Sequence, residues 1–331
     1  MASIKTRKQQ HIKLAQEPNS QIKSEIFENI YLKYKTLPEI NLKDVDTSTT
    51  LLGKNLIQPL IIASMTGGTE KAKRINENIS IAARETGVAF GVGSQRVTLK
   101  DKAAENSFKV VRKNAPNSII FANMGAIQLN YEAKIEDYQR VVDMIKADAI
   151  YLHLNALQEA VQPEGDTDFK ELLEKISKLI NKLSVPVFVK EVGHGIDYET
   201  AKNLVQMRVQ GIDVAGANGT SWAWIEAKRK NGGNLGEWFK DFGISTEESI
   251  RNVMKVKGKS KISVIASGGI RNPIHALKAR TIGTNYYSAA YPFLKPALEE
   301  SPKKLIDTIN EWQKGLKIAM FCTGQTSWEK I

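Results

Sequence analysis

The densest group of side chains that could do chemistry lies between residues 153 and 166, in the stretch HLNALQEAVQPEGD. This stretch follows directly on the apolar run 147–152, so the group is expected at the end of a strand. An imidazole, amides and carboxylates at one strand end can bind a metal ion and a charged substrate together. The side chains concerned are His153, Asn155, Gln158, Glu159, Glu164 and Asp166. A solvated loop with a helix cap is the alternative, but the chemistry at the other strand ends favours a site.

Eight short apolar runs are expected to form the strands that position this group, and most are continuous, as in strands buried on both faces. They are 59–64, 88–93, 118–123, 149–153, 185–190, 211–216, 262–267 and 285–290. Helical patterns lie at 70–86, 102–114, 133–146, 169–183, 197–210, 246–257, 273–282 and 295–319, with candidate N-caps at Thr69, Asp101, Asp197 and Ser245. Eight strand–helix units in order predict an α/β fold of the (β/α)8 TIM-barrel type, with a doubly wound sheet as the alternative.

Two segments lie outside this repeat. Residues 1–58 are expected to form an extended, polar N-terminal arm and barrel cover with a short helix near Ser24–Tyr34, and residues 59–331 the barrel. The longest connection runs from Gly216 to Ile244 and contains three tryptophans and the glycine-rich run 231–238. A long aromatic loop on the C-terminal rim of a barrel is either a lid or an insertion packed over the barrel edge, and the sequence leaves both open.

Polar or glycine-rich clusters end the other strands as well, and in a barrel these ends converge on one face. The clusters include SMTGGT (64–69), GSQR (93–96), Asn123, Lys190–Glu191, GANGTSW (216–222), SGGIR (267–271) and SAAYPFLK (288–295). SGGIR offers backbone N–H groups just before a helix, and with the last strand end it predicts a phosphate site of the kind that FMN often occupies. Lys190 is expected to face an anion or an electron-rich ring, with an ion pair to a core carboxylate as the alternative.

Composition narrows the class of protein. The formal net charge is +11, but no long basic run appears, which argues against nucleic-acid binding and fits either an anionic substrate or merely a basic surface. No apolar run approaches the roughly 20 residues of a membrane span, and the basic start lacks the apolar region of a secretory signal, so a cytoplasmic protein is expected. The lone Cys322 excludes an intramolecular disulfide and a cysteine-based zinc site.

Taken together, the motifs resemble one family, the type 2 isopentenyl-diphosphate isomerases, which are FMN-dependent (β/α)8 barrels. The resemblance covers nearly the whole chain, and RKxxH together with HLNxxQExxxPEGD separates this family from other flavin barrels such as the hydroxy-acid oxidases. The matching motifs are RKxxH at 7–11, MTGG at 65–68, GSQR at 93–96, HLNxxQE with PEGD at 153–166, VKE at 189–191, GT at 219–220 and ASGGIRNP at 266–273.

The resemblance implies a role for each matching residue. FMN contacts would come from Met65, Thr66, Gly67, Ser94, Asn123, Lys190 and Thr220, with the FMN phosphate against Gly269, Ile270, Arg271, Ala290 and Tyr291. Diphosphate contacts would come from Arg7, Lys8, Ser94, Gln95, Arg96, His153 and Asn155. Gln158 would lie at the substrate as the catalytic candidate, a proton relay or orienter, and Glu159 would hold Mg²⁺. His11 is expected to order the arm.

The implied activity is the isomerisation of isopentenyl diphosphate to dimethylallyl diphosphate in isoprenoid biosynthesis, without net oxidation. Reduced FMN would be the acid–base group, NADPH would serve only to reduce the flavin, and the protein would supply positioning and electrostatics. The family also suggests a homo-oligomer, a tetramer or octamer, with a small-molecule diphosphate as substrate and no nucleic-acid or membrane partner.

The chain departs from the usual family pattern at four single positions and at one helix end, which reads TIGTN at 281–285 in place of ALGA. Ala215 replaces a serine and Asn218 a glycine after the sixth strand, Gln10 stands where RKxxH usually has an acid, and His275 replaces an aspartate. These changes could weaken FMN binding or alter the long connection, whereas the substrate-binding positions are intact. Two other functions stay open: a hydroxy-acid oxidoreductase on a flavin barrel, which would need a catalytic histidine near the flavin, and a non-catalytic flavin-binding homologue.

Overall fold

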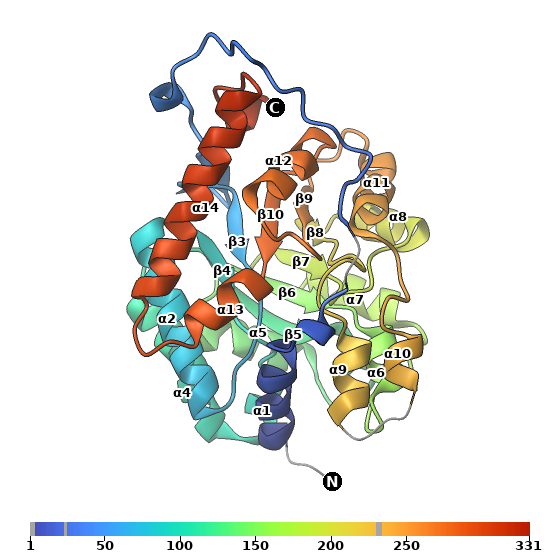
Figure 1. The fold of residues 1–331 in the computed structure, drawn as a ribbon. Helices are drawn as coiled ribbons and strands as arrows, with labels where there is room; N and C mark the ends of the chain where they lie inside the picture. The colour runs from blue at the N-terminus through green and yellow to red at the C-terminus, as the bar shows by residue number, and fades with distance from the viewer. Residues whose placement is uncertain (1–3, 23–24, 230–233) are drawn as a thin grey trace.

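Eight parallel strands close into a barrel, because β10 pairs with β3 as well as with β9 (Figure 1). The computed structural model describes residues 4–22, 25–229 and 234–331. The barrel strands are β3 (Leu60–Ile62), β4 (Ala89–Gly91), β5 (Ile120–Gly125), β6 (Ala149–His153), β7 (Val187–Lys190), β8 (Gly211–Asp213), β9 (Ser263–Ala266) and β10 (Tyr286–Ala289). All eight lie in the predicted apolar runs, β5 extending two residues beyond its run, and the predicted (β/α)8 barrel is confirmed.

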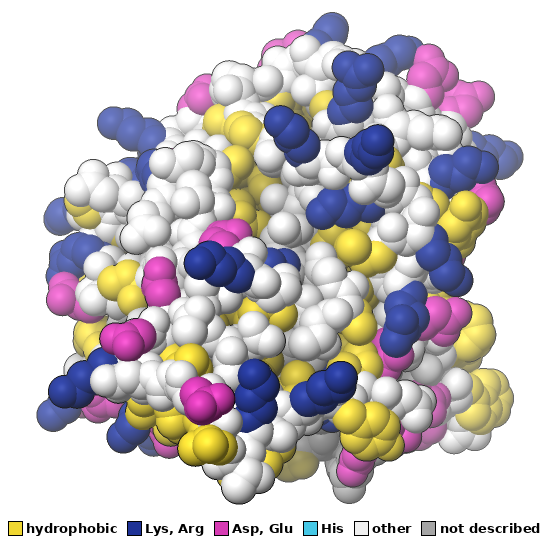
Figure 2. Space-filling view, turned by 90° about the horizontal axis from the view of Figure 1, so that it is seen from above, with side chains coloured by type: hydrophobic (Ala, Val, Ile, Leu, Met, Phe, Trp, Pro, Cys, Tyr) yellow, Lys and Arg dark blue, Asp and Glu magenta, His cyan; other side chains and the backbone are white. Residues whose placement is uncertain are grey.

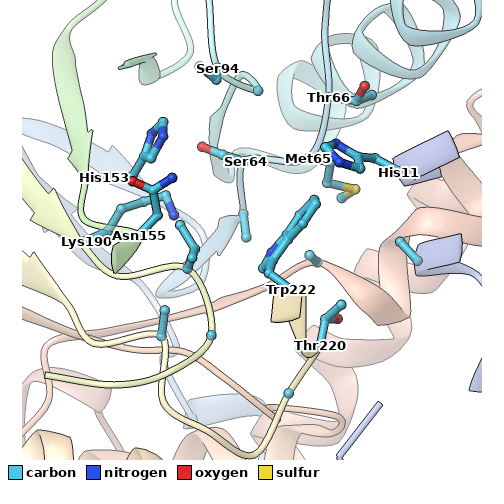
Figure 3. A pocket seen from close by; sticks show the side chains of 18 of the residues that line it. His11, Ser64, Met65, Thr66, Ser94, His153, Asn155, Lys190, Thr220 and Trp222 are labelled. Atoms are coloured by element: carbon cyan, nitrogen blue, oxygen red, sulfur yellow. The ribbon is translucent and has the colours of Figure 1, made fainter. Parts of the chain in front are cut away.

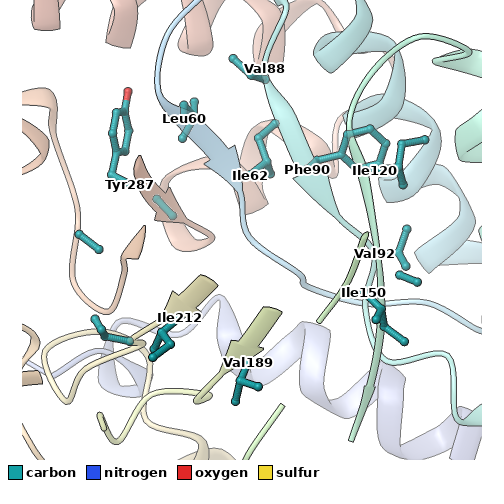
Figure 4. Close-up of a cluster of buried hydrophobic side chains, with 14 of the residues drawn as sticks. Leu60, Ile62, Val88, Phe90, Val92, Ile120, Ile150, Val189, Ile212 and Tyr287 are labelled. Carbon is teal, nitrogen blue, oxygen red and sulfur yellow. The ribbon is translucent and has the colours of Figure 1, made fainter. Parts of the chain in front are cut away.

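The strands are apolar throughout because both of their faces are buried. Outward side chains such as Leu60, Phe90 and Ile150 pack in the layer between the barrel and the helices (Figure 4). Inward side chains such as Phe121, Tyr151 and Phe188 form a second cluster that fills the barrel itself. The rings of Phe121 and Tyr151 stack with centroids 4.4 Å apart. The barrel is therefore a packed core, and only its open rim is free to hold a ligand.

Helices alternate with the strands and cover the outside of the barrel (Figure 1). They are α2 (Glu70–Thr86), α3 (Val97–Lys100), α4 (Asn106–Asn114), α5 (Ile135–Met144), α6 (Ala156–Val161), α7 (Leu172–Ile180), α8 (Tyr198–Gln206), α11 (Thr246–Lys257), α12 (Pro273–Thr281), α13 (Tyr291–Ala297) and α14 (Lys303–Cys322). The predicted caps are confirmed, since Thr69, Asp101, Asp197 and Ser245 each accept a backbone N–H.

The prediction of one helix over 295–319 is wrong. The segment divides into α13 and α14, with residues 298–302 between them. Pro302 precedes α14, and a proline disfavours helical backbone at the residue before it, here Ser301.

Short 3₁₀ turns also occur at η1 (Pro18–Ser20), η2 (Leu42–Asp44), η3 (Lys102–Glu105), η4 (Ala126–Asn130) and η5 (Trp328–Lys330).

The N-terminal arm differs from its prediction. Residues 25–34 contain no helix, and Ser24 lies outside the described residues; the helix of the arm is instead α1 (Ile4–Ala15). Lys8, His11, Ile12 and Ala15 recur at helical spacing and all line the cavity at the barrel rim. A polar helix that an isolated chain would hardly form is thus held by packing one face onto the barrel.

Beyond α1 the arm runs along the outside of the barrel to its opposite end (Figure 1). There β1 (Thr49–Leu51) and β2 (Lys54–Leu56) form an antiparallel hairpin. Leu51 and Leu56 join the cluster of inward barrel side chains, so the hairpin covers the closed end of the barrel. The cavity therefore opens at the carboxyl ends of the strands.

The long connection after β8 folds into two helices, α9 (Trp222–Arg229) and α10 (Leu235–Trp238); residues 231–233 of its glycine-rich run lie outside the described part of the chain. Trp224 is buried, whereas Trp238 is 67% exposed. Helix α9 packs against both α1 and α6. The connection is therefore an insertion packed over the rim, and through Trp222 it also lines the cavity.

Charge is spread over the surface. Figure 2 shows Lys and Arg side chains scattered across one face, with Asp and Glu between them. Among the described residues, no helix combines the length and apolar character that a bilayer crossing requires.

Candidate active site

The strand ends, α1 and α9 enclose one cavity at the barrel rim. Figure 3 shows His153, Asn155 and Lys190 on one side of it and His11 and Trp222 on the other. The predicted site residues that line it are Arg7, Lys8, Met65, Thr66, Ser94, Arg96, Asn123, His153, Asn155, Gln158, Glu159, Lys190, Thr220, Gly269, Ile270, Arg271, Ala290 and Tyr291. Segments from both ends of the sequence thus meet in one place.

Two of the residues that the family resemblance assigns to the site do not line the cavity, nor do Glu164 and Asp166 of the 153–166 group. Gln95 is fully buried behind its wall, where its amide donates to Val141 O at 2.9 Å and accepts from Asn123 N at 3.0 Å. It holds the end of β5 in place and makes no contact across the cavity. Gly67 lies against Phe108, and a Cβ at this glycine would overlap the ring at 2.0 Å. Glycine is needed at this position because the backbone approaches the Phe108 ring too closely to leave room for a Cβ.

Three cations face one end of the cavity, and two of them come from α1. Lys8 Nζ donates to Ser94 O at 2.7 Å and lies over the ring of Phe108. Burial, with the charge of Arg7 beside it, lowers the pKa of Lys8 to about 7. Burial also lowers the pKa of Arg7. Arg96 is fixed by a carboxylate 2.8 Å away, that of Asp166. Crowded cations of this kind form a site for a highly charged anion.

His153, at the end of β6, is a neutral ring. Its Nδ1 lies 2.9 Å from Asn123 Oδ1 on the neighbouring strand β5. Burial and the charges of Lys190 and Lys8 lower the pKa of His153 to about 3. Because the Asn123 oxygen can only accept, Nδ1 carries the proton and Nε2 is left as an acceptor. His153 can therefore accept a hydrogen bond from a ligand and contributes no charge.

Glu159 is the carboxylate of the cavity wall, on the first turn of α6. Its Oε1 accepts from Asn155 Nδ2 at 2.8 Å and its Oε2 from Asp166 N at 2.9 Å. Burial raises the pKa of Glu159, so a cation beside it would relieve a desolvated charge. Among the described residues no three His, Cys, Asp or Glu side chains cluster as a metal site. A metal ion beside Glu159 would need further oxygen ligands from a bound small molecule.

Glu226 on α9 joins the catalytic candidate to the arm, and the sequence analysis did not find it. Its Oε1 accepts from Gln158 Nε2 at 2.9 Å and lies 2.9 Å from His11 Nε2. Its Oε2 accepts from Arg229 Nη1. Burial alone would raise the pKa of Glu226, but the hydrogen bonds from His11 and Gln158 and the charge of Arg229 lower it to about 2. Helical spacing in WAWIEAKR, which places Glu226 and Arg229 three residues apart, was the available signal.

The floor of the cavity is polar. Lys190 and Asp213 are partners in the β7–β8 register, both line the cavity, and the charge of each acts on the pKa of the other. Burial lowers the pKa of Lys190 and raises that of Asp213, whose carboxylate accepts from Ser267 Oγ. The Oγ atoms of Ser64 and Ser288 are buried in this floor without a hydrogen-bond partner. Buried polar atoms of this kind are normally satisfied by a bound ligand or by ordered water.

Opposite the cations, the wall consists of backbone. Gly268 and Gly269 have φ values of +90° and +88°, which glycine alone adopts without strain. A Cβ on Gly219 would lie 2.8 Å from Gly269 N, so the two loops touch through their main chains. Arg271 donates to Ile22 O and Asn218 O, both at 2.9 Å. The arm and the loops after β8 and β9 thereby form one rigid surface.

Known proteins identify the family. An isopentenyl-diphosphate delta-isomerase of Nostoc sp. (strain PCC 7120) is 41% identical over all of this chain and 95% of its own. One of Rickettsia canadensis (strain McKiel) is 44% identical over 98% of this chain and 95% of its own. The FMN-dependent dehydrogenase family matches residues 152–331. This chain belongs to the FMN-dependent isopentenyl-diphosphate delta-isomerase family. The predicted membership is confirmed over the full length.

Solved structures of other proteins share the fold of this chain. A flavocytochrome b2 mutant with bound sulfite aligns with a TM-score of 0.69 at 15% identity, covering 97% of this chain and 80% of its own. A mandelate oxidase mutant with an FMN adduct aligns with a TM-score of 0.64 at 16% identity, covering 97% and 90%. At such identities the likeness concerns the barrel alone.

Proposed function

We propose that this chain converts isopentenyl diphosphate to dimethylallyl diphosphate with reduced FMN and Mg²⁺. The observation that carries the proposal is one cavity with two unlike walls, cations and a single carboxylate on one side and a glycine backbone on the other. A diphosphate with a metal ion fits the first wall and a flavin phosphate the second. The relatives named for this reaction support the assignment.

The floor and the backbone wall fit FMN. Buried oxygens of Ser64 and Ser288 lack partners there, and a flavin ring offers polar edges to them. Lys190 would face the electron-rich part of the ring, while Gly269, Ile270 and Arg271 would hold the phosphate. No dinucleotide-binding fold accompanies the barrel in the described residues, which favours FMN over FAD. Chromatography of the extracted flavin checks this choice, and FAD alone would contradict it.

The cation wall fits a magnesium diphosphate. Mg²⁺ is typically held by one or two carboxylates together with phosphate oxygens, and Glu159 is a carboxylate at the right place. Arg7, Lys8 and Arg96 would balance the remaining charge. His153 Nε2 and the unpartnered Asn155 Oδ1 would accept hydrogen bonds from ordered water or from a protonated ligand oxygen.

The reaction moves a double bond by one position. One proton is added at the terminal alkene carbon, and one is lost from the CH2 group next to the internal alkene carbon. Bound reduced FMN supplies the acid–base chemistry for both transfers. The protein orients the substrate. Glu226, ionised because of its low pKa, fixes the amide of Gln158 and the ring of His11. Gln158 is thus held in one rotamer at the substrate, the preorganisation from which enzymes gain most.

Turnover tests the proposal. The purified chain, loaded with FMN and reduced under anaerobic conditions, should convert isopentenyl diphosphate in the presence of Mg²⁺, with NADPH acting as a reductant of the flavin. Omission of Mg²⁺ or of the reductant should stop the reaction. Conversion of a hydroxy acid instead, or no conversion with fully reduced flavin, would contradict the proposal. We also expect a homo-oligomer and a cytoplasmic location, which gel filtration and fractionation would check.

A further inference from the structure

Asp166, the last residue of PEGD, lies behind the cavity wall and links two groups that face the cavity. Its Oδ2 forms an ion pair with Arg96 Nη1 at 2.8 Å and accepts a hydrogen bond from Gln128 Nε2 at 2.9 Å. Its main-chain N–H donates to Glu159 Oε2 at 2.9 Å. Arg96, Gln128 and Glu159 line the cavity, but Asp166 does not. One residue thus contacts both a cation and a carboxylate of the proposed magnesium diphosphate site.

The loop before Asp166 is shaped for this contact. Gly165 packs against the end of α6, where a Cβ would lie 1.9 Å from Glu159 O and 3.0 Å from Gln162 O. Main-chain atoms cannot move aside as a flexible side chain can. Gly165 N also donates to Gln162 O at 2.9 Å. The absence of a side chain at residue 165 is therefore what lets the N–H of Asp166 reach the Glu159 carboxylate.

A second carboxylate on Arg96 provides a contrast. Glu132 Oε1 accepts from Nε and Nη2 of Arg96, both at 3.2 Å, and its other oxygen pairs with Lys100. The side chain of Glu132 is 33% exposed, against 15% for Asp166. The Glu132 carboxylate contacts Arg96 and Lys100. The carboxylate of Glu159, in contrast, accepts hydrogen bonds from Asn155 and Asp166. Glu132 therefore orients the arginine alone.

We propose that Asp166 is a positioning residue that couples the arginine facing the diphosphate to the carboxylate facing the metal. This inference rests on the proposed function, which supplies the metal and the diphosphate. A metal carboxylate needs a fixed orientation, and groups that hold the ligands of a metal typically change its affinity by about 10- to 100-fold when removed. Through Asp166, the ordering of Arg96 by an anion also orders Glu159.

The consequence is that Mg²⁺ tightens anion binding through Asp166. Pyrophosphate alone would contact the cations, and with Mg²⁺ it would also engage Glu159. Loss of the Asp166 charge has opposing effects on pyrophosphate alone, since it removes a nearby like charge but loosens Arg96. The ratio of the two affinities, with and without Mg²⁺, isolates the coupling.

Calorimetric titration of the FMN-loaded chain with pyrophosphate, with and without Mg²⁺, measures that ratio. Asp166→Asn should lower it about 10-fold or more. Gly165→Ala keeps the charge of Asp166 but displaces its N–H, and it should lower the ratio similarly. Glu132→Gln, which removes the other carboxylate from Arg96, should keep the wild-type ratio. The visible spectrum should show FMN retained in all three variants, because the backbone wall at Gly268 and Gly269, which is proposed to hold the flavin phosphate (the flavin wall), lies opposite the cations.

Several outcomes would overturn the coupling. A wild-type ratio in Asp166→Asn would do so, as would an equal loss in Glu132→Gln. A loss in Asp166→Asn with no change in Gly165→Ala would assign the effect to charge and not to position. In turnover, Asp166→Asn should raise the Mg²⁺ concentration for half-maximal rate more than it lowers kcat at saturating Mg²⁺. Failure of the wild-type chain to convert isopentenyl diphosphate would contradict the proposed function and leave the binding ratio as a separate result.

Discussion

The two walls of the cavity are built in different ways. On the cation wall, side chains hold other side chains: Glu226 fixes Gln158, and Asp166 fixes Arg96. On the flavin wall the main chain itself forms the surface, at Gly268 and Gly269. The first wall depends on the identity of each side chain, whereas the second depends on backbone conformation and on the absence of Cβ atoms.

Three of the four single positions that depart from the usual family pattern, Ala215, Asn218 and His275, belong to the flavin wall or its support. The fourth, Gln10, lies on α1, where its side chain accepts from Arg229 Nε at 3.3 Å. Ala215 contributes its main chain, with N donating to Ser267 Oγ at 2.9 Å. The side chain of Asn218 accepts from Thr246 N at 2.7 Å and so ties the loop to α11. A wall made of backbone tolerates such changes, because the ligand-facing atoms stay where they are.

The largest expected effect comes from removing the cations of α1. Deletion of residues 1–10 should lower kcat/KM by on the order of 100-fold or more, because each charge-assisted contact contributes roughly 1.5–3 kcal/mol. Arg7→Ala/Lys8→Ala should reproduce the loss, and FMN should be retained. Lys13→Ala, which removes an exposed cation from the same helix, is the matched control. Steady-state kinetics measure the loss. Wild-type kcat/KM in the truncated chain would mean that the arm only covers the barrel and does not bind the substrate.

The next effect concerns Glu159, the carboxylate proposed to hold Mg²⁺. Glu159→Gln should keep the fold and FMN but lose turnover by roughly 30-fold or more, since breaking a buried charge pair costs about 2 kcal/mol or more. The Mg²⁺ dependence of the remaining rate should also flatten. An unchanged rate together with an unchanged Mg²⁺ requirement would remove Glu159 from the metal site.

On the flavin wall, Gly269→Ala should weaken FMN binding by about 10-fold. The φ of +88° strains any residue with a Cβ by roughly 1–2 kcal/mol, and that Cβ would lie 2.5 Å from Asn218 O. Gly258→Ala is the control, because its φ is also positive but nothing lies within 4 Å of the added Cβ. Fluorescence titration of the apoprotein with FMN compares them. Equal affinity in both variants would mean that the backbone wall does not hold the phosphate.

The smallest effect is on pH dependence. The pKa of Lys8, lowered by burial to about 7, predicts that pyrophosphate affinity falls as pH rises above about 7. The unfolded chain keeps an ordinary lysine at 10.5, so between these values it binds more protons and stability should rise with pH. Lys8→Met should flatten both profiles. Calorimetry and thermal melts across this range check them, and unchanged profiles would contradict the assignment.

The strands were predictable because a strand that is buried on both faces forms a continuous apolar run in the sequence. Most helices were then predictable from the helical patterns between these runs. Helix α1 was missed because its buried face is mainly polar, Lys8 and His11 beside Ile12, and hydrophobic periodicity does not register it. Glu226 was missed for a related reason. Its carboxylate is buried by partners from α1 and α6, which are distant in sequence, and no local pattern marks such a meeting.

Gln95 illustrates the opposite error. The GSQR motif places it beside Ser94 and Arg96, which line the cavity, and adjacency suggested a shared role. Its side chain turns the other way, into the layer between β5 and α5, where it satisfies buried main-chain groups. A motif thus identifies the segment that forms a site, and only the direction of each side chain assigns its role.

The most direct test counts reductant against product. With FMN, Mg²⁺ and a limiting amount of NADPH under anaerobic conditions, the account predicts many molecules of dimethylallyl diphosphate per NADPH oxidised, because the flavin is reduced once and the chain then only positions proton transfer. NMR of the product and absorbance at the nicotinamide band give both counts. One NADPH consumed for every product formed would contradict the account and assign the barrel to net redox chemistry.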